Sequence, residues 1–437
     1  MSKPNQQNTG HALFQRGFAV NVDGSLHSRL ELIERSDVLA ARLIEAGIGR
    51  IALDGRNLSA VTTSLGAALS AGCEVVLLRN ERASDLTLRE LAVEAFVAPD
   101  GSIMQTDRAT GSREPSMLIP TSGTTGPPKW ARHALSSMIE STAVRTASLV
   151  GQRFLLTFHG ASFAGLQVLL SAASAGGEIC GLASPGMERL AKLALEYPPT
   201  VVSGTPSFWR NFLLTMGNRA SSLPIRYITL GGEIVDQAIL DLLRKKFPHA
   251  KMKHVYASTE TGPLAHVEDG LAGLPAEWLH RDDLGFQLAI RQGCLCVRSK
   301  HLMTGYANGR GDRDRFDQDG YFSTGDKVKV NGDRIVFEGR ADAIINVGGA
   351  KVSPEELEHS LVAMPGVVDV IVYGLPNPVT GFVVAADVVL DGNTDPTSFK
   401  TNALSALGAR FDRYKIPRRF RIVESLHRTE AGKLERR

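Results

Sequence analysis

The chain has 437 residues, of which 43% are hydrophobic and 22% are charged, and its formal net charge is +3. This length exceeds what one compact core usually holds and predicts two or three domains. So small a net charge gives no electrostatic reason to expect nucleic acid or an anionic membrane surface as the main partner.

The cysteines and the apolar runs limit the setting in which the protein works. Its four cysteines, of which Cys294 and Cys296 are near neighbours, are too few and too scattered for a disulfide framework. That pair has no second pair at metal-ligand spacing, so no structural zinc is expected. The polar stretch 1–10 does not resemble a signal peptide, and polar residues interrupt apolar runs such as 154–170. We expect a cytoplasmic protein that is a monomer or a homodimer.

Helix and strand signals alternate through the first half of the chain. Residues 30–46 carry apolar side chains at helical spacing (Leu30, Ile33, Leu39, Leu43 and Ile44), and 61–71 and 235–247 also indicate helices. Short strands are expected at 50–53, 73–78, 117–119, 153–158, 200–203, 227–230 and 252–256. This alternation predicts βαβ units and a mainly parallel sheet.

The pattern changes twice further along the chain. After Gly285, short strands alternate with turn residues, which is typical of an antiparallel meander. After Gly339, a helix should begin with Ser353 as its N-cap and Pro354 at its first position. Strands at 367–372, 382–390 and 420–423 and a helix at 396–410 complete a compact α+β unit. We place the boundary of this unit at Arg340 to Asp342.

A loop rich in glycine and hydroxyl groups follows the strand at 117–119. It reads Thr121-Ser122-Gly123-Thr124-Thr125-Gly126-Pro127-Pro128-Lys129. Its glycines let backbone amides approach a ligand closely, and Lys129 carries a charge suited to phosphate oxygens. It is not a Walker A loop, because two prolines separate Gly126 from Lys129. The loop predicts a polyphosphate site, with a plain surface turn as the alternative.

Later segments carry further polar residues at strand ends and turns. They are Gly231-Gly232-Glu233, Tyr256-Ala257-Ser258-Thr259-Glu260, Tyr321-Phe322-Ser323-Thr324-Gly325-Asp326, Gly339-Arg340-Ala341-Asp342 and Arg428-Thr429-Glu430-Ala431-Gly432-Lys433. Together with the loop, and in this order, they resemble the adenylate-forming superfamily of acyl-CoA synthetases, peptide-synthetase adenylation domains and luciferases. The chain is also similar in size to the compact o-succinylbenzoate–CoA ligases.

The resemblance implies an α/β fold in two parts. A large N-terminal AMP-binding domain (1–341) would have mixed, mainly parallel sheets and a small β meander, and would hold the acid and ATP sites. A small, mobile α+β C-terminal domain (342–437) would carry the catalytic lysine, Lys433, and Asp342 would be the hinge.

The resemblance also implies the role of each site residue. ATP would bind Thr121, Ser122, Gly123, Thr124, Thr125, Gly126, Lys129, Gly232, Glu233, Tyr256, Asp326 and Arg340. Thr259 and Glu260 would act in catalysis beside Lys433, with Glu260 holding Mg²⁺. Coenzyme A would pass Gly348, Gly349 and Lys351. For single motifs, plain turns, a solvated Glu260 and a Glu233 near a helix start remain the alternatives.

The acid site is expected around His159, Gly231 and Ala257. Ala257 replaces the glycine usual in the family and should narrow the pocket, and Trp130 replaces a glycine after the loop lysine without an evident reason. The segment Phe158-His159-Gly160-Ala161 has no carboxylate to pair with an α-amine, so an α-amino acid is not expected. Neighbouring residues predict an apolar pocket for an aryl or medium acyl acid: Ala161, Phe163, Ala164, Gly165, Val202 and Gly231. His159 is alternatively a buried histidine, and His133 is expected to be structural.

The implied reaction is an ATP-dependent acid–thiol ligation with ATP, Mg²⁺ and coenzyme A. The acid would form an acyl-AMP with release of pyrophosphate and would then pass to coenzyme A. Three alternatives remain open: loading of an acyl carrier protein, formation of an amide, and a non-catalytic nucleotide-binding protein on the same fold.

Overall fold

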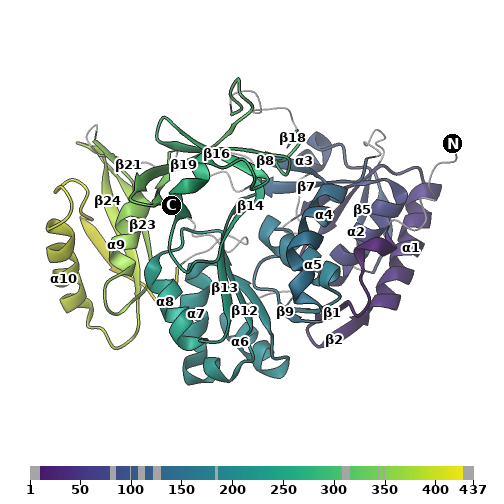
Figure 1. Ribbon diagram of the computed structural model, residues 1–437, viewed down its shortest axis with the longest axis horizontal. Helices are drawn as coiled ribbons and strands as arrows, with labels where there is room; N and C mark the ends of the chain where they lie inside the picture. Colours follow the sequence, from purple (N-terminus) through teal and green to yellow (C-terminus); the bar gives the residue numbers. More distant parts are fainter. Residues whose placement is uncertain are drawn as a thin grey trace.

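The computed structural model of the chain describes residues 10–78, 85–98, 100–106, 114–121, 129–182, 186–307, 315–341, 345–347 and 350–426. Within these ranges, the N-terminal part is built on two large sheets, the next part is a meander, and a separate α+β unit follows (Figure 1). None of the described helices combines the length and the apolar composition needed to cross a membrane.

The first large sheet carries the strands on both sides of the phosphate loop. Its members are β3 (Arg50–Asp54), β4 (Glu74–Leu78), β5 (Ala95–Val97), β6 (Ile103–Gln105), β7 (Ser116–Thr121), β8 (Lys129–Ala134) and β18 (Gly305–Tyr306). Their spatial order is β18-β8-β7-β4-β3-β5-β6, with parallel pairing from β7 to β5 and antiparallel pairing at both edges. All five residues of β4 are buried, as expected for a parallel strand that is covered on both faces.

The second large sheet carries the strands that lead to the predicted acid and metal residues. Its members are β1 (Ala19–Val22), β2 (Ser25–Ser28), β9 (Arg153–Leu155), β10 (Glu178–Gly181), β11 (Val201–Gly204), β12 (Tyr227–Gly231), β13 (Lys251–Ser258) and β14 (Gly262–Val267). The order is β14-β13-β12-β11-β9-β10-β1-β2, and only the two edge pairs are antiparallel. The second sheet is therefore mainly parallel, as expected, whereas the first sheet has as many antiparallel as parallel pairings.

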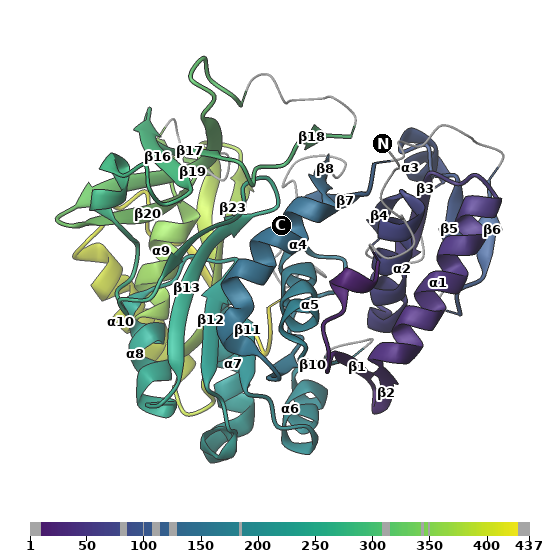
Figure 2. The ribbon, with the colours of Figure 1, turned by 45° about the vertical axis from the view of Figure 1, so that its right-hand side comes forward.

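Four helices fill the space between the two sheets: α1 (Arg29–Glu45), α2 (Leu58–Ala71), α4 (Leu135–Thr146) and α5 (Phe163–Ala175). One continuous core joins their apolar side chains to those of both sheets, from Ile51 on β3 to Val201 on β11. Figure 2 shows α4 and α5 in this central position, beside β11 to β13.

Further helices cover the outer faces of the two sheets. The short α3 (Asp85–Glu90) lies with the first sheet, whereas α6 (Met187–Glu196), α7 (Pro206–Met216) and α8 (Gln237–Lys246) pack on the second. Trp130 on β8 is 6% exposed and packs in the outer core of the first sheet beside Val76 and Leu118. The Trp130 side chain, which stands where the family usually has glycine, therefore fills space in this core, and this explains why a large aromatic residue suits the position.

The predicted buried face of the first helix is partly wrong. Leu30 and Ile44 are 73% and 59% exposed, so they do not belong to the core. The buried stripe of α1 instead consists of Leu32, Ser36, Leu39, Ala40 and Leu43. The side chains of Ser36 and Ala40 are small, so α1 can approach α2 closely. Ser36 Oγ then donates to the backbone oxygen of Thr63, on α2, at 3.1 Å.

The expected meander is a sheet of order β15-β20-β19-β17-β16. Its strands are β15 (Leu274–Pro275), β16 (Phe286–Arg291), β17 (Cys294–Ser299), β19 (Phe322–Asn331) and β20 (Arg334–Arg340). All its pairings are antiparallel, as predicted.

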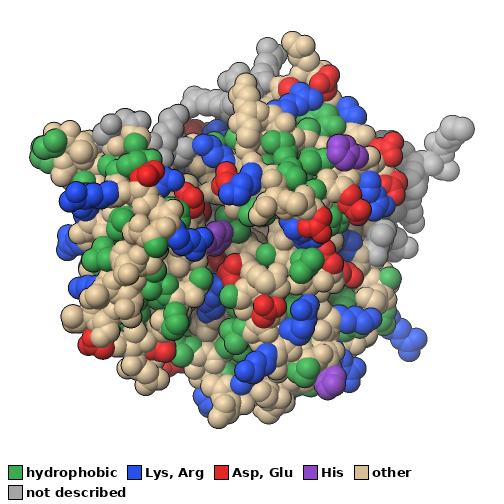
Figure 3. Space-filling view, turned by 60° about the vertical axis from the view of Figure 1, so that its left-hand side comes forward, with side chains coloured by type: hydrophobic (Ala, Val, Ile, Leu, Met, Phe, Trp, Pro, Cys, Tyr) green, Lys and Arg blue, Asp and Glu red, His purple; other side chains and the backbone are tan. Residues whose placement is uncertain are grey.

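The C-terminal unit has a core of its own around Val352, Leu357 and Phe399. It contains β21 (Ile345–Val347), β22 (Ala350–Val352), α9 (Pro354–Val362), β23 (Val367–Asn377), β24 (Gly381–Leu390), α10 (Pro396–Gly408) and β25 (Arg419–Ile422). It touches the rest of the molecule where α9 meets β20 and where β23 meets α7. Figure 3 shows acidic and basic side chains interspersed over one face of the molecule.

Two predictions concern the start of this unit. Ser353 is at the N-cap position of α9, but its hydroxyl makes no capping bond; it donates to the backbone oxygen of Glu338 at 2.7 Å instead. This bond ties the helix start to β20. The domain boundary at Arg340 to Asp342 stays a prediction, because residues 342–344 lie outside the described residues.

Candidate active site

The two ends of the predicted phosphate loop lie side by side. Thr121 at the end of β7 pairs with Lys129 at the start of β8, and the residues between them, 122–128, lie outside the described residues. Thr121 is buried, whereas Lys129 is exposed. The Lys129 ammonium stands 5.3 Å from the centroid of the Tyr306 ring, at a distance that allows a cation–π contact.

Tyr306 also binds the predicted metal residue. Its hydroxyl donates to Glu260 Oε1 at 3.1 Å, so one tyrosine contacts both Glu260 and the lysine of the phosphate loop. Tyr306 occupies this position because β18 pairs with β8. The structure therefore brings Lys129 and Glu260 together, although 131 positions separate them in the sequence.

The turn that presents Thr259 and Glu260 is held from several sides. It links β13 to β14, and the buried Thr261 accepts a hydrogen bond from the Ser258 backbone at 3.0 Å. His133 Nε2 donates to the backbone oxygen of Thr259 at 2.6 Å. Burial lowers the pKa of His133 despite this hydrogen bond and the nearby Glu260, so the ring is a neutral donor, and His133 is structural as expected.

The predicted ribose residues form a second cluster. The Tyr256 hydroxyl donates to Asp326 Oδ2, and Arg340 Nη1 donates to Asp326 Oδ1 at 3.3 Å and to the Thr324 oxygen at 3.0 Å. Burial and the Asp326 carboxylate raise the pKa of Tyr256 well above its usual range, which keeps its hydroxyl protonated. A carboxylate oxygen can accept two hydrogen bonds. Each Asp326 oxygen accepts one from Tyr256 or Arg340, so each can still accept a second one from a ribose hydroxyl.

The glycines of the predicted adenine segment end strand β12. Gly231 lines the cavity described below, and Gly232 has a φ of +81°, a conformation that favours glycine. Glu233 Oε2 accepts a hydrogen bond from the backbone nitrogen of Ser207 at 3.0 Å, in the first turn of α7. This contact is with α7 and not with α8, the helix that follows Glu233, and the role of Glu233 in binding ATP stays a prediction.

The described residues fit a magnesium ion held mainly by substrate. Glu260 offers a carboxylate oxygen beside the phosphate-loop lysine, and Mg²⁺ typically takes one or two carboxylates together with phosphate oxygens and water. Among the residues that the structure describes, no group of three or more histidine, cysteine or acidic side chains forms a dedicated metal cage.

A cavity of about 480 Å³ lies between helices α4 and α5 and the face of strands β11 to β14. Side chains alternate along a strand, so residues two apart share a face. On β13 these are Lys253, Val255 and Ala257, and Thr259 follows them at the end where Gly204 and Gly231 also lie. We call this the nucleotide end of the cavity, because it reaches Thr259, a residue of the predicted catalytic site.

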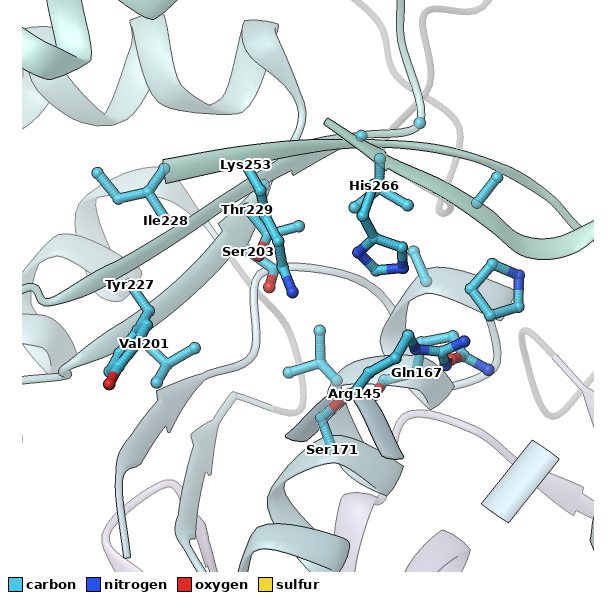
Figure 4. A pocket seen from close by; sticks show the side chains of 18 of the residues that line it. Arg145, Gln167, Ser171, Val201, Ser203, Tyr227, Ile228, Thr229, Lys253 and His266 are labelled. Carbon is cyan, nitrogen blue, oxygen red and sulfur yellow. Dashed lines mark hydrogen bonds between the residues drawn. The ribbon is translucent and has the colours of Figure 1, made fainter. Parts of the chain in front are cut away.

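Four residues, which together we call the distal end, line the cavity farther from Thr259: Arg145, Gln167, Lys253 and His266 (Figure 4). Lys253 pairs with Thr229 and His266 with Val255, and the lining continues past them to Lys251 and Tyr227. Arg145 Nη2 donates to Gln167 Oε1 at 3.0 Å and to Thr142 Oγ1 at 3.3 Å. Burial lowers the pKa of Arg145 to about 10, which leaves it fully charged at neutral pH. Burial, with Lys253 and Arg145 nearby, lowers the pKa of His266 to about 3, so this ring is neutral.

The predicted acid residues are placed as follows. Gly231 and Ala257 line the cavity, and so do Phe163 and Ala164. A register shift interrupts the β13–β14 pairing between Tyr256 and Ala257, so the replacement of glycine falls at an irregular point of the strand.

His159 does not belong to the described lining; its Nδ1 accepts a hydrogen bond from the Ala161 backbone at 3.1 Å in the turn before α5. Ala161, Gly165 and Val202 are buried and do not line the cavity either. The predicted apolar wall is present, in Phe154, Phe158 and Phe163, but the charged side chains of Arg145 and Lys253, which were not predicted, line the cavity as well.

Several predicted site residues lie outside the described residues: Ser122, Gly123, Thr124, Thr125, Gly126, Asp342, Gly348, Gly349 and Lys433. Lys351 pairs with Asn346 between β22 and β21, and only its backbone is described.

Sequence reasoning missed Tyr306 and the charged residues of the distal end. The position of Lys253 could have been predicted. Alternate residues of a strand share one face, so Val255 and Lys253 lie on the same face as Ala257. Arg145 and Tyr306 had no such signal, because their positions depend on the packing of α4 and on the edge pairing of β18.

Comparisons with known proteins identify the family. The model of the AMP-binding enzyme family matches residues 79–307, and the model of the AMP-binding enzyme C-terminal domain matches residues 356–433. A long-chain-fatty-acid–CoA ligase of Mycobacterium tuberculosis is 27% identical, over 74% of this chain and 67% of its own length. A 3-hydroxybenzoate–CoA ligase of Aromatoleum is 25% identical, over 79% of this chain and 69% of its own length.

A solved structure of similar size shares the fold. The o-succinylbenzoate CoA synthetase of Bacillus subtilis, in complex with its acyl-adenylate intermediate, has a TM-score of 0.76 at 20% identity. The superposition covers 99% of this chain and 97% of that protein.

The fold and the matched regions define a protein of the adenylate-forming superfamily. The chain belongs to the AMP-binding enzyme family. The predicted superfamily, the α/β fold class with its α+β C-terminal unit, and the class of AMP-forming acid–thiol ligase are confirmed. ATP and coenzyme A are the co-substrates of this class.

Proposed function

We propose that the protein activates a non-amino carboxylic acid as an acyl-AMP and then transfers the acyl group to coenzyme A. The observation that carries this proposal is the meeting of two sites at one turn. Thr259 lines the acid cavity, and its neighbour Glu260 is joined through Tyr306 to Lys129 of the phosphate loop. An acid in the cavity would therefore end beside the phosphates of ATP.

In the first step, the carboxylate attacks the α-phosphate, and pyrophosphate leaves toward the phosphate loop. Bound Mg²⁺ supplies positive charge that offsets the charge on the phosphates. Thr259 orients the α-phosphate, Asp326 and Arg340 hold the ribose, and Lys433 stabilises the negative charge that builds up. Positioning of the two reactants then accounts for much of the rate.

In the second step, the C-terminal domain turns about Asp342, and the thiol reaches the acyl-AMP past Gly348, Gly349 and Lys351. Coenzyme A is the acceptor that we propose, because the matched relatives bear the names of CoA ligases. We also place the protein in the cytoplasm as a monomer or homodimer; all four cysteines are free thiols, which suits a reducing compartment.

Pyrophosphate exchange tests the first step. The protein is incubated with ATP, Mg²⁺, labelled pyrophosphate and a panel of aryl, acyl and dicarboxylic acids, with acid omitted as the control. We expect label to enter ATP only when an acid and Mg²⁺ are both present. If no acid supports exchange while ATP still binds, the chain is a nucleotide-binding protein without this activity.

Product analysis tests the second step. Coenzyme A is added to the acid that gave exchange, and the mass of the product is measured. An acyl-CoA supports the proposal. Accumulated acyl-AMP without a thioester contradicts coenzyme A as acceptor and directs the search to a carrier protein or an amine.

A further inference from the structure

The distal end of the acid cavity is rich in cations. Among the described residues that line the cavity, Arg145, Lys251 and Lys253 are basic and Glu268 alone is acidic. Lys251 and Glu268 are exposed, whereas Arg145 and Lys253 are half-buried. With His266 neutral, the distal end keeps a net positive charge at neutral pH.

Neither of the two inner cations has an ion-pair partner within the part of the chain that the structure describes. Arg145 bonds only to the neutral groups of Gln167 and Thr142. Lys253 is influenced by the charge of Glu268, but its ammonium forms no salt bridge with it. Burial is the main cause that lowers the pKa of Lys253, and Arg145 adds repulsion. Two unpaired, partly buried cations that face one cavity are costly unless a ligand neutralises them.

Hydrogen-bond donors at the distal end also lack acceptors among the described residues. Gln167 Nε2 and His266 Nε2 are buried, and neither has a hydrogen-bond partner there. Figure 4 shows Lys253 and His266 pointing from their strands into the space beside Arg145 and Gln167 on the helices. The distal end thus offers several donors, which suit a group with acceptor oxygens and negative charge.

The spacing leaves room for an acid between the two ends. Lys253 and Ala257 are four residues apart on one strand face, or about 13 Å at roughly 3.3 Å per residue. A lysine side chain reaches about 6 Å with bonds of about 1.5 Å. Several ångströms then remain for a spacer such as a benzene ring or a short methylene chain, and the apolar wall of Phe154, Phe158 and Phe163 suits it.

We propose that the acid substrate carries a second anionic group, a carboxylate at the far end of its spacer, which binds Arg145 and Lys253. The inference rests on the proposed function and narrows its substrate class. The reacting carboxylate lies at Thr259, and the second carboxylate accepts hydrogen bonds from the distal end. Arg145 and Lys253 then determine specificity and do not touch the reacting atoms.

The first arm of the test uses the wild-type protein with matched acids. Pyrophosphate exchange is measured for hexanoate, adipate and the monoamide of adipate, and for benzoate, terephthalate and the monoamide of terephthalate. The monoamides keep the shape and hydrogen bonding of the diacids but remove the distal charge. We expect kcat/KM for at least one diacid to exceed that of both its monoacid and its monoamide by about 10-fold or more, because hydrogen bonds to a charged group are worth about 1.5–3 kcal/mol.

The second arm changes the distal end. In Arg145→Gln and Lys253→Gln, the ratio of kcat/KM for diacid over monoacid should fall by about 10- to 100-fold. Arg145→Lys keeps the charge and should keep part of the ratio. Arg153→Gln removes an exposed arginine that does not line the cavity and should leave the ratio unchanged. Thermal unfolding of each variant shows whether it is folded, and the wild-type arm decides the proposal if one is not.

Two results overturn the inference. One is a wild-type protein that uses monoacids or monoamides as well as diacids. The other is a diacid preference that folded Arg145 and Lys253 variants retain. Exchange with monoacids alone refutes only the second anionic group, whereas the absence of exchange with every acid refutes the proposed function and the inference with it.

Discussion

The two ends of the cavity are built in different ways. At the nucleotide end, the functional side chains stand in short contiguous segments, such as Tyr256 to Glu260 and Thr324 to Asp326, and turns hold them in place. At the distal end, Arg145, Gln167, Lys253 and His266 come one each from four elements. In the function that we propose, contacts to ATP would thus depend on local turn chemistry, whereas the choice of acid would depend on isolated residues that helix packing brings to the sheet.

The largest expected effect separates the nucleotide end from the distal end. Lys433→Ala should lower acyl-AMP formation by about 100- to 1000-fold, because it removes one group that stabilises developing charge. The loss should be the same for every acid, since Lys433 does not act on the distal group. Thioester formation from supplied acyl-AMP should be spared, because the domain turn carries Lys433 away. Both half-reactions are measured separately.

Lys400→Ala is the matched control for this variant, because it removes an exposed lysine from α10 of the same unit. It should leave both half-reactions intact. An equal loss of the two half-reactions in Lys433→Ala would rule out its assignment to the first step.

A smaller effect is expected at the link between metal and phosphate residues. Tyr306→Phe keeps the ring near Lys129 but removes the hydroxyl that donates to Glu260. Acyl-AMP formation should fall by about 2- to 13-fold, as for the loss of one hydrogen bond worth about 0.5–1.5 kcal/mol, and the Mg²⁺ concentration at half-maximal rate should change. Titration of the rate with Mg²⁺ measures this, with Tyr414→Phe as the control. An unchanged Mg²⁺ dependence together with a changed diacid ratio would place Tyr306 at the wrong end.

The last prediction concerns the charge state of the distal end and is measured as stability, since no change in rate is expected at neutral pH. Burial holds the pKa of His266 near 3, below its unfolded value near 6.5, so the unfolded chain binds a proton there first as pH falls. The stability that His266 contributes is complete above pH about 6.5 and is lost toward pH about 3, by up to about 1.4 kcal/mol per pH unit. His266→Gln should flatten this slope in denaturant unfolding between these values.

The exposed His249→Gln is the matched control and should retain the wild-type slope. Identical slopes in the wild type and in His266→Gln would mean that burial does not lower the pKa of His266 in the folded protein. The distal end would then gain a positive charge as the pH falls through about 6.5.

The sequence was sufficient for most of the fold because the signals were local. Alternating periodicities predicted β3, β4, β7, β9, β11, β12 and β13, and turn residues predicted the meander. Edge strands such as β2, β6 and β18 were not predicted, because they are short. The buried face of α1 was harder, because Leu30 and Ile44 are apolar yet exposed, and Ser36 is polar yet buried. Whether these residues are buried depends on packing between segments that are distant in the sequence. The same is true of Trp130, which packs in the outer core of the first sheet.

In the candidate site, too, residues in contiguous motifs could be predicted, whereas residues placed by packing could not. Contiguous motifs led to Glu260, Tyr256 and Asp326, which the structure connects to partners that suit their predicted roles. The pocket was expected to be apolar because its neighbours in sequence are apolar. Arg145 stands ten residues into a helix and shows no pattern of its own until α4 packs on the sheet.

The hydrogen bond between His133 and the backbone of Thr259 has a mechanical consequence. His133 lies on β8, which begins at the end of the phosphate loop, and the carbonyl that it holds adjoins Glu260. One hydrogen bond of the buried His133 therefore fixes β8 relative to the peptide next to Glu260. His133 thereby joins the first large sheet, to which β8 belongs, to the turn between β13 and β14 of the second.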